Sequence, residues 1–337
     1  MAYIKKIKVF LITLLCPVIL VGYNQLIDHD LKVLKDILQL NPHLDQKNPR
    51  QLGTQIWDNN RLTYLNLSTE NIAILPENLG DLENLVYLNL DFNQLTTVPE
   101  SMSDLINLEE LYLSDNILIY LPEAIGNLIN LEEFQASNNN ISYLPKTICN
   151  LPNLTALRVN DNRLISLPDS IGRLSKLETF SASRNQLLRL PESMIDLENL
   201  SVLILSSNEI ETLPGNFGNL KRLTNLSMES NNLKSIPESI GALKRLNTLN
   251  LSGNDLISLP ESISESIGLR KIFIYGNQLN YIPSSICDLE DVSAFRVSNN
   301  NLCDRYFFEC MDEFYPQDQS DCCRGKNGQS NWISCPE

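Results

Sequence analysis

The chain has 337 residues, of which 43% are hydrophobic and 20% are charged, and its formal net charge is −15. This composition excludes a disordered chain, and it argues against nucleic-acid binding because the mean field of the protein repels phosphate groups. Length alone would suggest about two domains.

Residues 1–22 differ from the rest of the chain. Lys5, Lys6 and Lys8 precede an unbroken apolar run over residues 9–21, and the small residue Gly22 follows. This is the pattern of a secretory signal peptide, and the run is short for a membrane-spanning helix. The segment predicts a secreted or cell-surface protein with no membrane span after its removal. An uncleaved membrane anchor is the alternative.

Residues 23–61 are expected to form an N-terminal cap that contains a short helix. One apolar stripe has helical spacing and consists of Ile27, Leu31, Leu34 and Leu38. Asp28 or Asp30 is the expected N-cap of this helix, and Asn41-Pro42 is expected to end it. Trp57 is expected to help cover the first repeat.

From Leu62 to Leu302 the sequence repeats every 23 residues, in eleven units without insertion or deletion. Such a fixed period is typical of a solenoid, in which each unit is one coil. Apolar residues occupy positions 1, 4, 6 and 11 of the unit, and the alternation at positions 4 and 6 predicts a short strand with one buried face. Position 15 is proline in the first ten units, which suits an extended back wall that leads into a short helical turn.

Position 9 is asparagine in ten units, and the first unit carries Glu70 there instead. The ten asparagines are Asn93, Asn116, Asn139, Asn162, Asn185, Asn208, Asn231, Asn254, Asn277 and Asn300. A buried asparagine has both a donor and an acceptor, so it can satisfy backbone groups where the strand ends. We expect a ladder in which each amide bonds its own coil and the next one.

These repeats resemble the leucine-rich-repeat family, in its 23-residue form with the consensus LPxxIGxLxNLxxLxLxxNxL. The segment LPDSIGRLSKLETFSASRNQL, which starts at Leu167, shows the match, and the resemblance covers residues 62–302. It implies an α/β-type solenoid, a horseshoe with a parallel β-sheet on its concave face and an irregular or 3-10 convex side. A helical N-terminal cap and a cysteine-rich C-terminal cap would close the two ends.

The C-terminal end is similar to that of secreted bacterial members of this family, which often read IC.L … NNQLC … C … C. Ile286-Cys287-Asp288-Leu289, Asn301-Leu302-Cys303, Cys310 and Cys322 match that pattern. Residues 303–337 are therefore expected to form a disulfide-stapled cap. The disulfide candidates are Cys287, Cys303, Cys310, Cys322, Cys323 and Cys335, with fifteen possible pairings. Cys149 is expected to be a small buried filler.

A metal site is the lesser alternative for this end. The tail has no Cys-x-x-Cys pair and no histidine, which argues against a mixed zinc site and against a catalytic thiol, although a zinc site made of cysteines alone stays open. We expect neither a metal nor a cofactor.

Positions 3 and 5 of each unit point out from the strand face, which lines the concave side in this family. The candidate partner-binding residues are Tyr64, Tyr87, Glu110, Tyr112, Glu133, Arg158, Lys271, Phe273, Tyr275 and Arg296. Aromatic and arginine side chains are common anchors in interfaces. Glu110 and Glu133 would be like charges on neighbouring strands, which is unfavourable. A solvated face with charges placed by chance is the alternative interpretation.

The sequence favours a non-catalytic extracellular recognition module for a protein or glycan partner. It shows no catalytic triad motif and no phosphate loop. Some bacterial leucine-rich-repeat effectors carry a ubiquitin-ligase domain, but the residues after Leu302 are too few for one. The alternatives are a structural component of the cell envelope, or an intracellular signalling scaffold if the N-terminal segment is not a signal.

Overall fold

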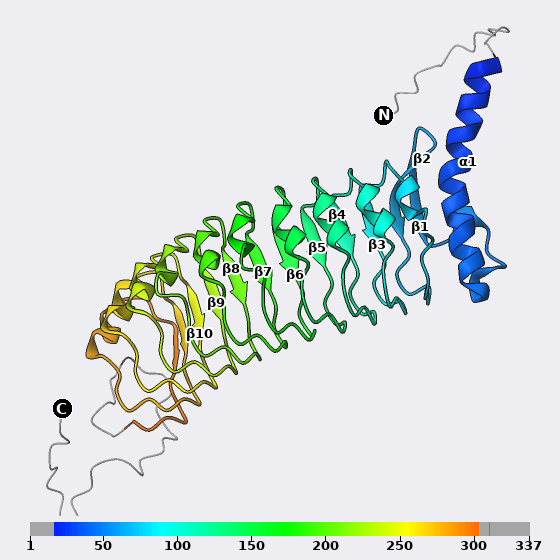
Figure 1. The fold of residues 1–337 in the computed structure, drawn as a ribbon. Helices are drawn as coiled ribbons and strands as arrows, with labels where there is room; N and C mark the ends of the chain where they lie inside the picture. The colour runs from blue at the N-terminus through cyan, green and yellow to red at the C-terminus, as the bar shows by residue number, and fades with distance from the viewer. Residues whose placement is uncertain (1–16, 303–309, 311–337) are drawn as a thin grey trace, which may run out of the picture.

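The computed structural model describes residues 17–302 and Cys310, with side chains described from His29 onward. The chain forms an open, curved solenoid with a helix at its N-terminal end (Figure 1). Within the described residues the sheet has twelve strands, whose order in space is their order in the sequence. The leucine-rich-repeat architecture predicted from the sequence is therefore confirmed. Within residues 17–302, the structure has no helix that could serve as a membrane span.

Each coil contributes one short strand to a parallel sheet, and one antiparallel strand precedes the first coil. The strands are β1 (Thr54–Asp58), β2 (Arg61–Asn66), β3 (Tyr87–Asn89), β4 (Glu110–Tyr112), β5 (Glu133–Gln135), β6 (Ala156–Arg158), β7 (Thr179–Ser181), β8 (Val202–Ile204), β9 (Asn225–Ser227), β10 (Thr248–Asn250), β11 (Lys271–Phe273) and β12 (Ala294–Arg296). From β2 onward each residue pairs with the residue 23 positions later, as Tyr64 does with Tyr87. The repeat period is thus the register of the sheet.

Short 3-10 turns follow the extended back wall of each of the first ten coils. They are η3 (Leu79–Asp81), η4 (Glu100–Asp104), η5 (Glu123–Asn127), η6 (Lys146–Asn150), η7 (Ile171–Arg173), η8 (Glu192–Asp196), η9 (Phe217–Asn219), η10 (Glu238–Ala242), η11 (Glu261–Glu265) and η12 (Ser284–Asp288). The proline at position 15 lies one to three residues before the start of each turn. One continuous apolar core fills the space between strands and turns.

The N-terminal helix α1 (Pro17–Leu40) is longer than predicted and passes through Gly22. The expectation that Asp28 or Asp30 caps it is wrong, because the helix already begins at Pro17, a residue that suits a first helical position. The helix ends before Asn41-Pro42, as predicted. Val33, Leu34, Ile37 and Leu38 bury their side chains, and Leu31 packs against the same core.

The cap also contains a strand that the sequence interpretation missed. Strand β1 pairs with β2 in antiparallel fashion, and Asp58 faces Arg61 across a two-residue turn. Both turn residues, Asn59 and Asn60, have positive φ, at 46° and 65°. This is the backbone conformation of a tight hairpin turn whose twist matches the strands. Trp57 on β1 packs against the core, as expected. Two further 3-10 turns, η1 (Pro42–Leu44) and η2 (Pro49–Gln51), link α1 to this hairpin.

The asparagines at position 9 form a continuous ladder of buried amides. Asn93 Nδ2 donates to the carbonyl oxygens of Leu90 in its own coil and Leu67 in the preceding coil, both at 2.9 Å, and its Oδ1 accepts from Ile72 N at 2.8 Å. The same pattern recurs as far as Asn300. The expectation that each amide serves the next coil is wrong in direction, because the side chain leans back along the solenoid.

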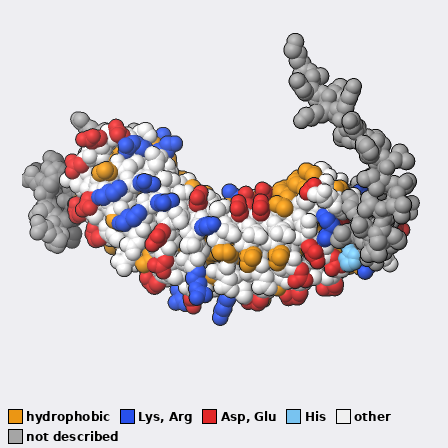
Figure 2. Space-filling model, turned by 90° about the horizontal axis from the view of Figure 1, so that it is seen from above, with side chains coloured by type: hydrophobic (Ala, Val, Ile, Leu, Met, Phe, Trp, Pro, Cys, Tyr) orange, Lys and Arg blue, Asp and Glu red, His pale blue; other side chains and the backbone are white. Residues whose placement is uncertain are grey.

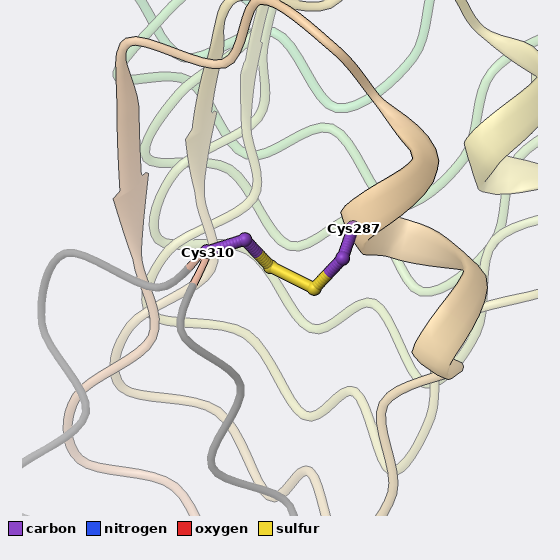
Figure 3. The surroundings of a disulfide bond; sticks show 2 residues. All are labelled: Cys287 and Cys310. Carbon is purple, nitrogen blue, oxygen red and sulfur yellow. A yellow bond between two sulfur atoms is a disulfide. The ribbon is translucent and has the colours of Figure 1, made fainter.

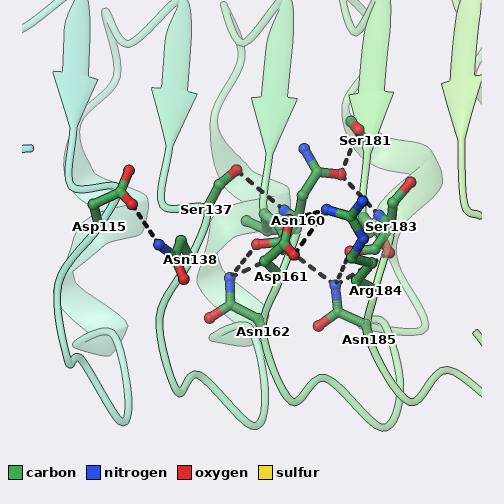
Figure 4. Close-up of polar contacts among 12 residues, drawn as sticks. Asp115, Ser137, Asn138, Asn160, Asp161, Asn162, Ser181, Ser183, Arg184 and Asn185 are labelled. Carbon is green, nitrogen blue, oxygen red and sulfur yellow. Dashed lines mark hydrogen bonds and ion pairs between the residues drawn. The ribbon is translucent and has the colours of Figure 1, made fainter. Parts of the chain in front are cut away.

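One position before the ladder, the backbone of every coil adopts a left-handed conformation. Position 8 is occupied by Thr69, Phe92, Asp115, Asn138, Asp161, Arg184, Ser207, Ser230, Gly253, Gly276 and Asn299, all with positive φ. Figure 4 shows this region in the middle coils, where position 8 side chains such as Asp161 and Arg184 gather beside the ladder. Only Gly adopts this conformation without steric penalty, and Asn and Asp tolerate it well.

At the C-terminal end, a disulfide joins Cys287 on η12 to Cys310, with 5.8 Å between their Cα atoms (Figure 3). It ties the back of the tenth coil to the segment that follows the last strand. Cys303, Cys322, Cys323 and Cys335 lie outside the described residues. Cys149 is a free, buried thiol, 3% exposed.

Candidate binding surface on the strand face

The outward residues of the short strands form one continuous surface, which we call the strand face. In most of the strands β3–β12 the middle residue is buried and the two flanking residues are at least partly exposed, as in Tyr87–Asn89. Seen from above, the molecule is a crescent (Figure 2). Nine of the ten candidate partner-binding residues lie on strands, and Tyr275 follows β11 by two positions.

Three tyrosines from adjacent strands form a stack at the N-terminal end of this face. The rings of Tyr64 and Tyr87 are nearly parallel, at 11°, with 4.2 Å between their centroids. Tyr112 joins them from β4, with 5.4 Å between its centroid and that of Tyr87. The stack follows from the register, because Tyr64 pairs directly with Tyr87. It forms an aromatic surface across three coils.

The two glutamates beside this stack are neighbours in register, and each has its own partner. The Tyr112 hydroxyl donates to Glu110 Oε2 at 2.6 Å. Glu133 forms an ion pair with Arg158 and accepts from Gln135 Nε2 at 2.7 Å. These contacts offset the repulsion expected between Glu110 and Glu133. Arg158 is consequently held by Glu133.

Burial raises the pKa of Tyr112, and its hydrogen bond to Glu110 raises it further. Burial also raises the pKa of Tyr87. Both hydroxyls therefore stay protonated over the physiological pH range, and the Tyr112 hydroxyl remains a donor to the carboxylate.

The C-terminal candidates form a second, separate group. Phe273 on β11 pairs in register with Arg296 on β12, and Lys271 pairs with Ala294. The Tyr275 hydroxyl donates to Glu229 Oε1 at 3.2 Å, and burial raises the Tyr275 pKa. Five coils separate this group from Arg158, or about 24 Å at the usual strand spacing. The structure thus divides the candidate residues into two groups.

Between the two groups the strand face is hollowed. A depression of about 440 Å³ spans the middle coils, lined mainly by serines, with Asp161, Arg184 and Glu229 as its charged residues. Arg184 is held by Asp161 at 3.2 Å. The Ser183 hydroxyl is buried and has no hydrogen-bond partner among the described residues. The described residues contain no cluster of three or more His, Cys, Asp or Glu that could hold a metal ion.

A family model described as a leucine-rich repeat region matches residues 29–160 and 138–235, and a second leucine-rich-repeat model matches residues 245–266. The first model alone covers more than half of the chain. The chain is a leucine-rich-repeat protein. A search of curated protein sequences found no match.

Solved structures show the same fold. The leucine-rich-repeat chain is 28% identical to the plant peptide hormone receptor RGFR1, solved in complex with RGF2, with a TM-score of 0.63. A TDR receptor gives 26% identity and a TM-score of 0.59. The Arabidopsis receptor kinase HAESA, solved with the peptide hormone IDA and the co-receptor SERK1, gives 24% identity and a TM-score of 0.66.

The matched regions cover 68%, 71% and 82% of this chain, but only 38% of the RGFR1 chain, 48% of the TDR chain and 54% of the HAESA chain. The leucine-rich-repeat protein therefore spans about half the length of these receptors or less.

Phe92 is an exposed aromatic residue that the sequence interpretation missed. Its side chain is 57% exposed, and its backbone has a φ of 55° at position 8 of the second coil. A bulky side chain in the left-handed region is unfavourable, and an exposed one has no compensating burial. The signal in the sequence was available: the other coils carry Thr, Asp, Asn, Arg, Ser or Gly at position 8. Strained residues of this kind cluster at functional sites.

Proposed function

We propose that this leucine-rich-repeat protein is a non-catalytic recognition module that binds a protein or peptide partner at the N-terminal part of its strand face, outside the cell. The fold it shares with the peptide-bound receptor RGFR1 supports a peptide or protein ligand. The signal-like pattern of residues 1–22 supports an extracellular location. A catalytic role has no support in the sequence motifs.

The observation that carries the proposal is Phe92. Its side chain buries little surface, and its conformation is one that Asn or Gly would adopt with less strain. A residue that lowers stability without packing is best explained by a contact made only in a complex. The stack of Tyr64, Tyr87 and Tyr112, on the same and adjacent coils, provides the kind of aromatic surface that anchors interfaces.

The charges around these aromatic residues indicate a basic partner segment. Glu110 and Glu133 lie on the face, and their neighbours Glu109 and Glu132 are exposed. Asp91 precedes Phe92 in the second coil, and Asp115 occupies the same repeat position as Phe92 in the third coil. The basic side chain of Arg158 lies beside these acids, but it is already paired with Glu133. Lysine or arginine side chains of a partner would therefore meet a complementary potential.

A glycan fits this part of the face less well. Sugars that bind aromatic residues lie against an open ring face. Tyr64 and Tyr87 are nearly parallel and 4.2 Å apart, so each covers one face of the other. The edges and hydroxyls that remain suit a polypeptide, which can supply apolar and charged side chains together.

A random peptide library displayed on phage tests the proposal, with the full chain as bait. We expect the retained peptides to be enriched in Lys and Arg together with apolar residues. Phe92→Asn should reduce their binding at least tenfold, although its free energy of unfolding should stay equal or rise by up to about 1 kcal/mol. Loss of affinity with retained stability separates a binding role from a packing role.

The matched control is Ile257→Asn, which also removes an exposed apolar side chain, 56% exposed, but on the opposite side of the ladder in the ninth coil. It should leave peptide binding unchanged. Equal binding by wild type and Phe92→Asn, or equal loss in both variants, would refute the proposal. Retained peptides without basic residues would refute its assignment of partner charge.

A further inference from the structure

Six cations gather along the edge of the solenoid where the strands begin, near its C-terminal end. Figure 2 shows Lys and Arg side chains concentrated at that end of the face seen from above. We call this patch the basic rim, and it consists of Lys221, Arg222, Lys244, Arg245, Arg270 and Lys271. The patch arises from the last two positions of two units and positions 2 and 3 of a third.

The register of the sheet brings these residues together. Lys221-Arg222 precede β9, Lys244-Arg245 precede β10, and Arg270-Lys271 lead into and begin β11. These three strands are neighbours in the sheet. The Lys-Arg pairs before β9 and β10 occupy equivalent positions, about 4.8 Å apart, and Arg270-Lys271 lies three residues further along the next coil. Their side chains are exposed, except Arg270, which is partly exposed.

Only two of the six cations have an acidic partner among the described residues. Lys244 Nζ lies 3.5 Å from Glu265, and Arg270 lies 3.0 Å from Asp291. Both ion pairs are exposed, so they neutralise little. Lys221, Arg222, Arg245 and Lys271 have no carboxylate within 4.0 Å in the part of the chain that the structure describes.

The surroundings of the basic rim are polar. Thr224, Asn247 and Thr248 stand between the cations, and Ile267, 67% exposed, is the large apolar residue beside them. Glu198 and Glu290 border the patch at the equivalent position of the sixth and tenth coils. The patch therefore offers charges and hydrogen-bond donors on an open edge.

Four uncompensated cations on adjacent coils repel one another, in a chain whose net charge is −15. A bound polyanion would relieve this repulsion and release counterions. We propose that the basic rim binds a linear sulfated polysaccharide. Sulfate groups spaced along such a chain would pair with the cations of the basic rim, and its hydroxyl groups would bond the neighbouring Thr and Asn side chains.

Two other polyanions fit the patch less well. Single-stranded nucleic acid uses aromatic side chains to stack its bases, and the patch contains none. An acidic peptide would anchor apolar side chains in a pocket, and the open edge offers only Ile267 and the half-buried Phe273 two residues beyond Lys271. The basic rim is also several coils from Phe92 and the tyrosine stack, so this proposal does not depend on the proposed function.

Heparin is the probe for this proposal, and binding is titrated with the full chain at several salt concentrations. The triple variant Arg222→Ser, Arg245→Ser, Lys271→Ser should bind heparin at least tenfold more weakly at about 150 mM salt. The slope of log affinity against log salt should fall by about two to three, near one unit per lost contact. Circular dichroism should show an unchanged unfolding midpoint, because the three side chains are exposed or lack partners.

The matched control is Lys146→Ser, Arg163→Ser, Arg189→Ser, which removes the same types and number of exposed cations from the fourth, fifth and sixth coils. It should keep affinity within twofold of wild type. No heparin binding by wild type, or equal loss in both triple variants, would overturn the proposal. Desulfated heparin should not bind; equal binding of desulfated heparin, single-stranded DNA or polyglutamate would also overturn it.

Discussion

The two ends of the solenoid are closed by different chemistry. At the N-terminal end, buried polar side chains meet the first coil. Asp30, 0% exposed, accepts from Arg61 Nε at 3.0 Å and from Leu62 N at 2.6 Å. Asn41, 2% exposed, accepts from Ala73 N at 2.8 Å and donates to Ile74 O at 2.9 Å. Helix α1 is thus fixed to the first coil by individually satisfied hydrogen bonds.

At the C-terminal end, the described contact beyond the last strand is covalent. The disulfide between Cys287 and Cys310 bridges 23 residues, and Cys310 packs against the core of the last coils. The comparison shows that a noncovalent contact must provide a hydrogen-bond partner for each buried polar group of the coil that it covers. A disulfide needs only two cysteines at the right separation, so we expect the N-terminal contacts to be sensitive to single substitutions and the C-terminal contact to redox state.

The largest expected effect is at the N-terminal end. Asp30→Ala would leave the Arg61 guanidinium and the Leu62 N–H without their buried acceptor, so it should destabilise the cap by about 3–5 kcal/mol. Urea unfolding and amide hydrogen exchange of β1 and β2 measure the loss. Asp45→Ala, an exposed acid in the same cap, is the control. A loss within about 1 kcal/mol of that control would show that the buried pair does not hold the cap.

The next effect is at the C-terminal end. Replacing both Cys287 and Cys310 by Ser should destabilise the last coils by about 3 kcal/mol, because the unfolded chain regains the freedom of a 23-residue loop. Amide exchange should accelerate in β11 and β12 but not in β1 and β2. Cys149→Ser, at a free thiol, serves as the control. Equal acceleration at both ends would contradict the idea that the two closures act locally.

A third test compares an interior coil with the first coil. Asn208 donates to Ala182 O and Leu205 O, both at 2.9 Å, and accepts from Leu187 N at 3.0 Å. Asn208→Ala should cost about 1–3 kcal/mol, since these backbone groups are buried. Glu70→Ala, at the same repeat position, should cost less, because the partly buried Glu70 side chain pairs with Lys47, which stays half exposed, and serves no buried backbone group among the described residues. Equal losses would mean that the first coil also needs its position 9 residue.

The direction of the ladder explains why Glu70 is tolerated. Each ladder amide bonds backbone groups of the preceding coil. The first coil is preceded by residues of the N-terminal segment rather than by another coil. The sequence predicted the repeat register, the strands and the buried positions, because the same burial recurs every 23 residues. It did not predict the ladder's direction, because the pattern of asparagines is the same whichever neighbour they contact.

Other features depended on pairs of residues that the repeat pattern does not connect. Glu110 bonds Tyr112 and Glu133 pairs with Arg158 because of how these side chains are oriented on the strand face. The basic rim spans the boundary between units, so an alignment by repeat position separates its members. The hairpin of β1 and β2 could have been predicted. Asn59-Asn60 separates two segments in which polar and apolar residues alternate, and this pattern is typical of a two-residue hairpin turn.

The smallest expected effect contrasts a coil near the N-terminal end with a middle coil. Asp91 in the second coil accepts from Ser114 N at 2.6 Å, and Asn160 in the fifth coil accepts from Ser183 N at 2.8 Å in the same way. Burial raises the pKa of Asp91, and the charge of Asp115 adds to this effect. The folded state therefore favours the protonated carboxyl more than the unfolded state does.

The sign of the pH dependence follows from the raised pKa. The favourable contribution of Asp91 is present below its unfolded pKa, about 3.9, and is lost as pH rises through its higher folded value. Asp91→Asn keeps the bond to Ser114, as Asn160 shows, and removes the titration. Wild type should lose stability relative to this variant as pH rises from about 4 through the raised pKa of Asp91. Asp45→Asn is the exposed control, and parallel stability curves for wild type and Asp91→Asn would show that Asp91 is not strained by its burial.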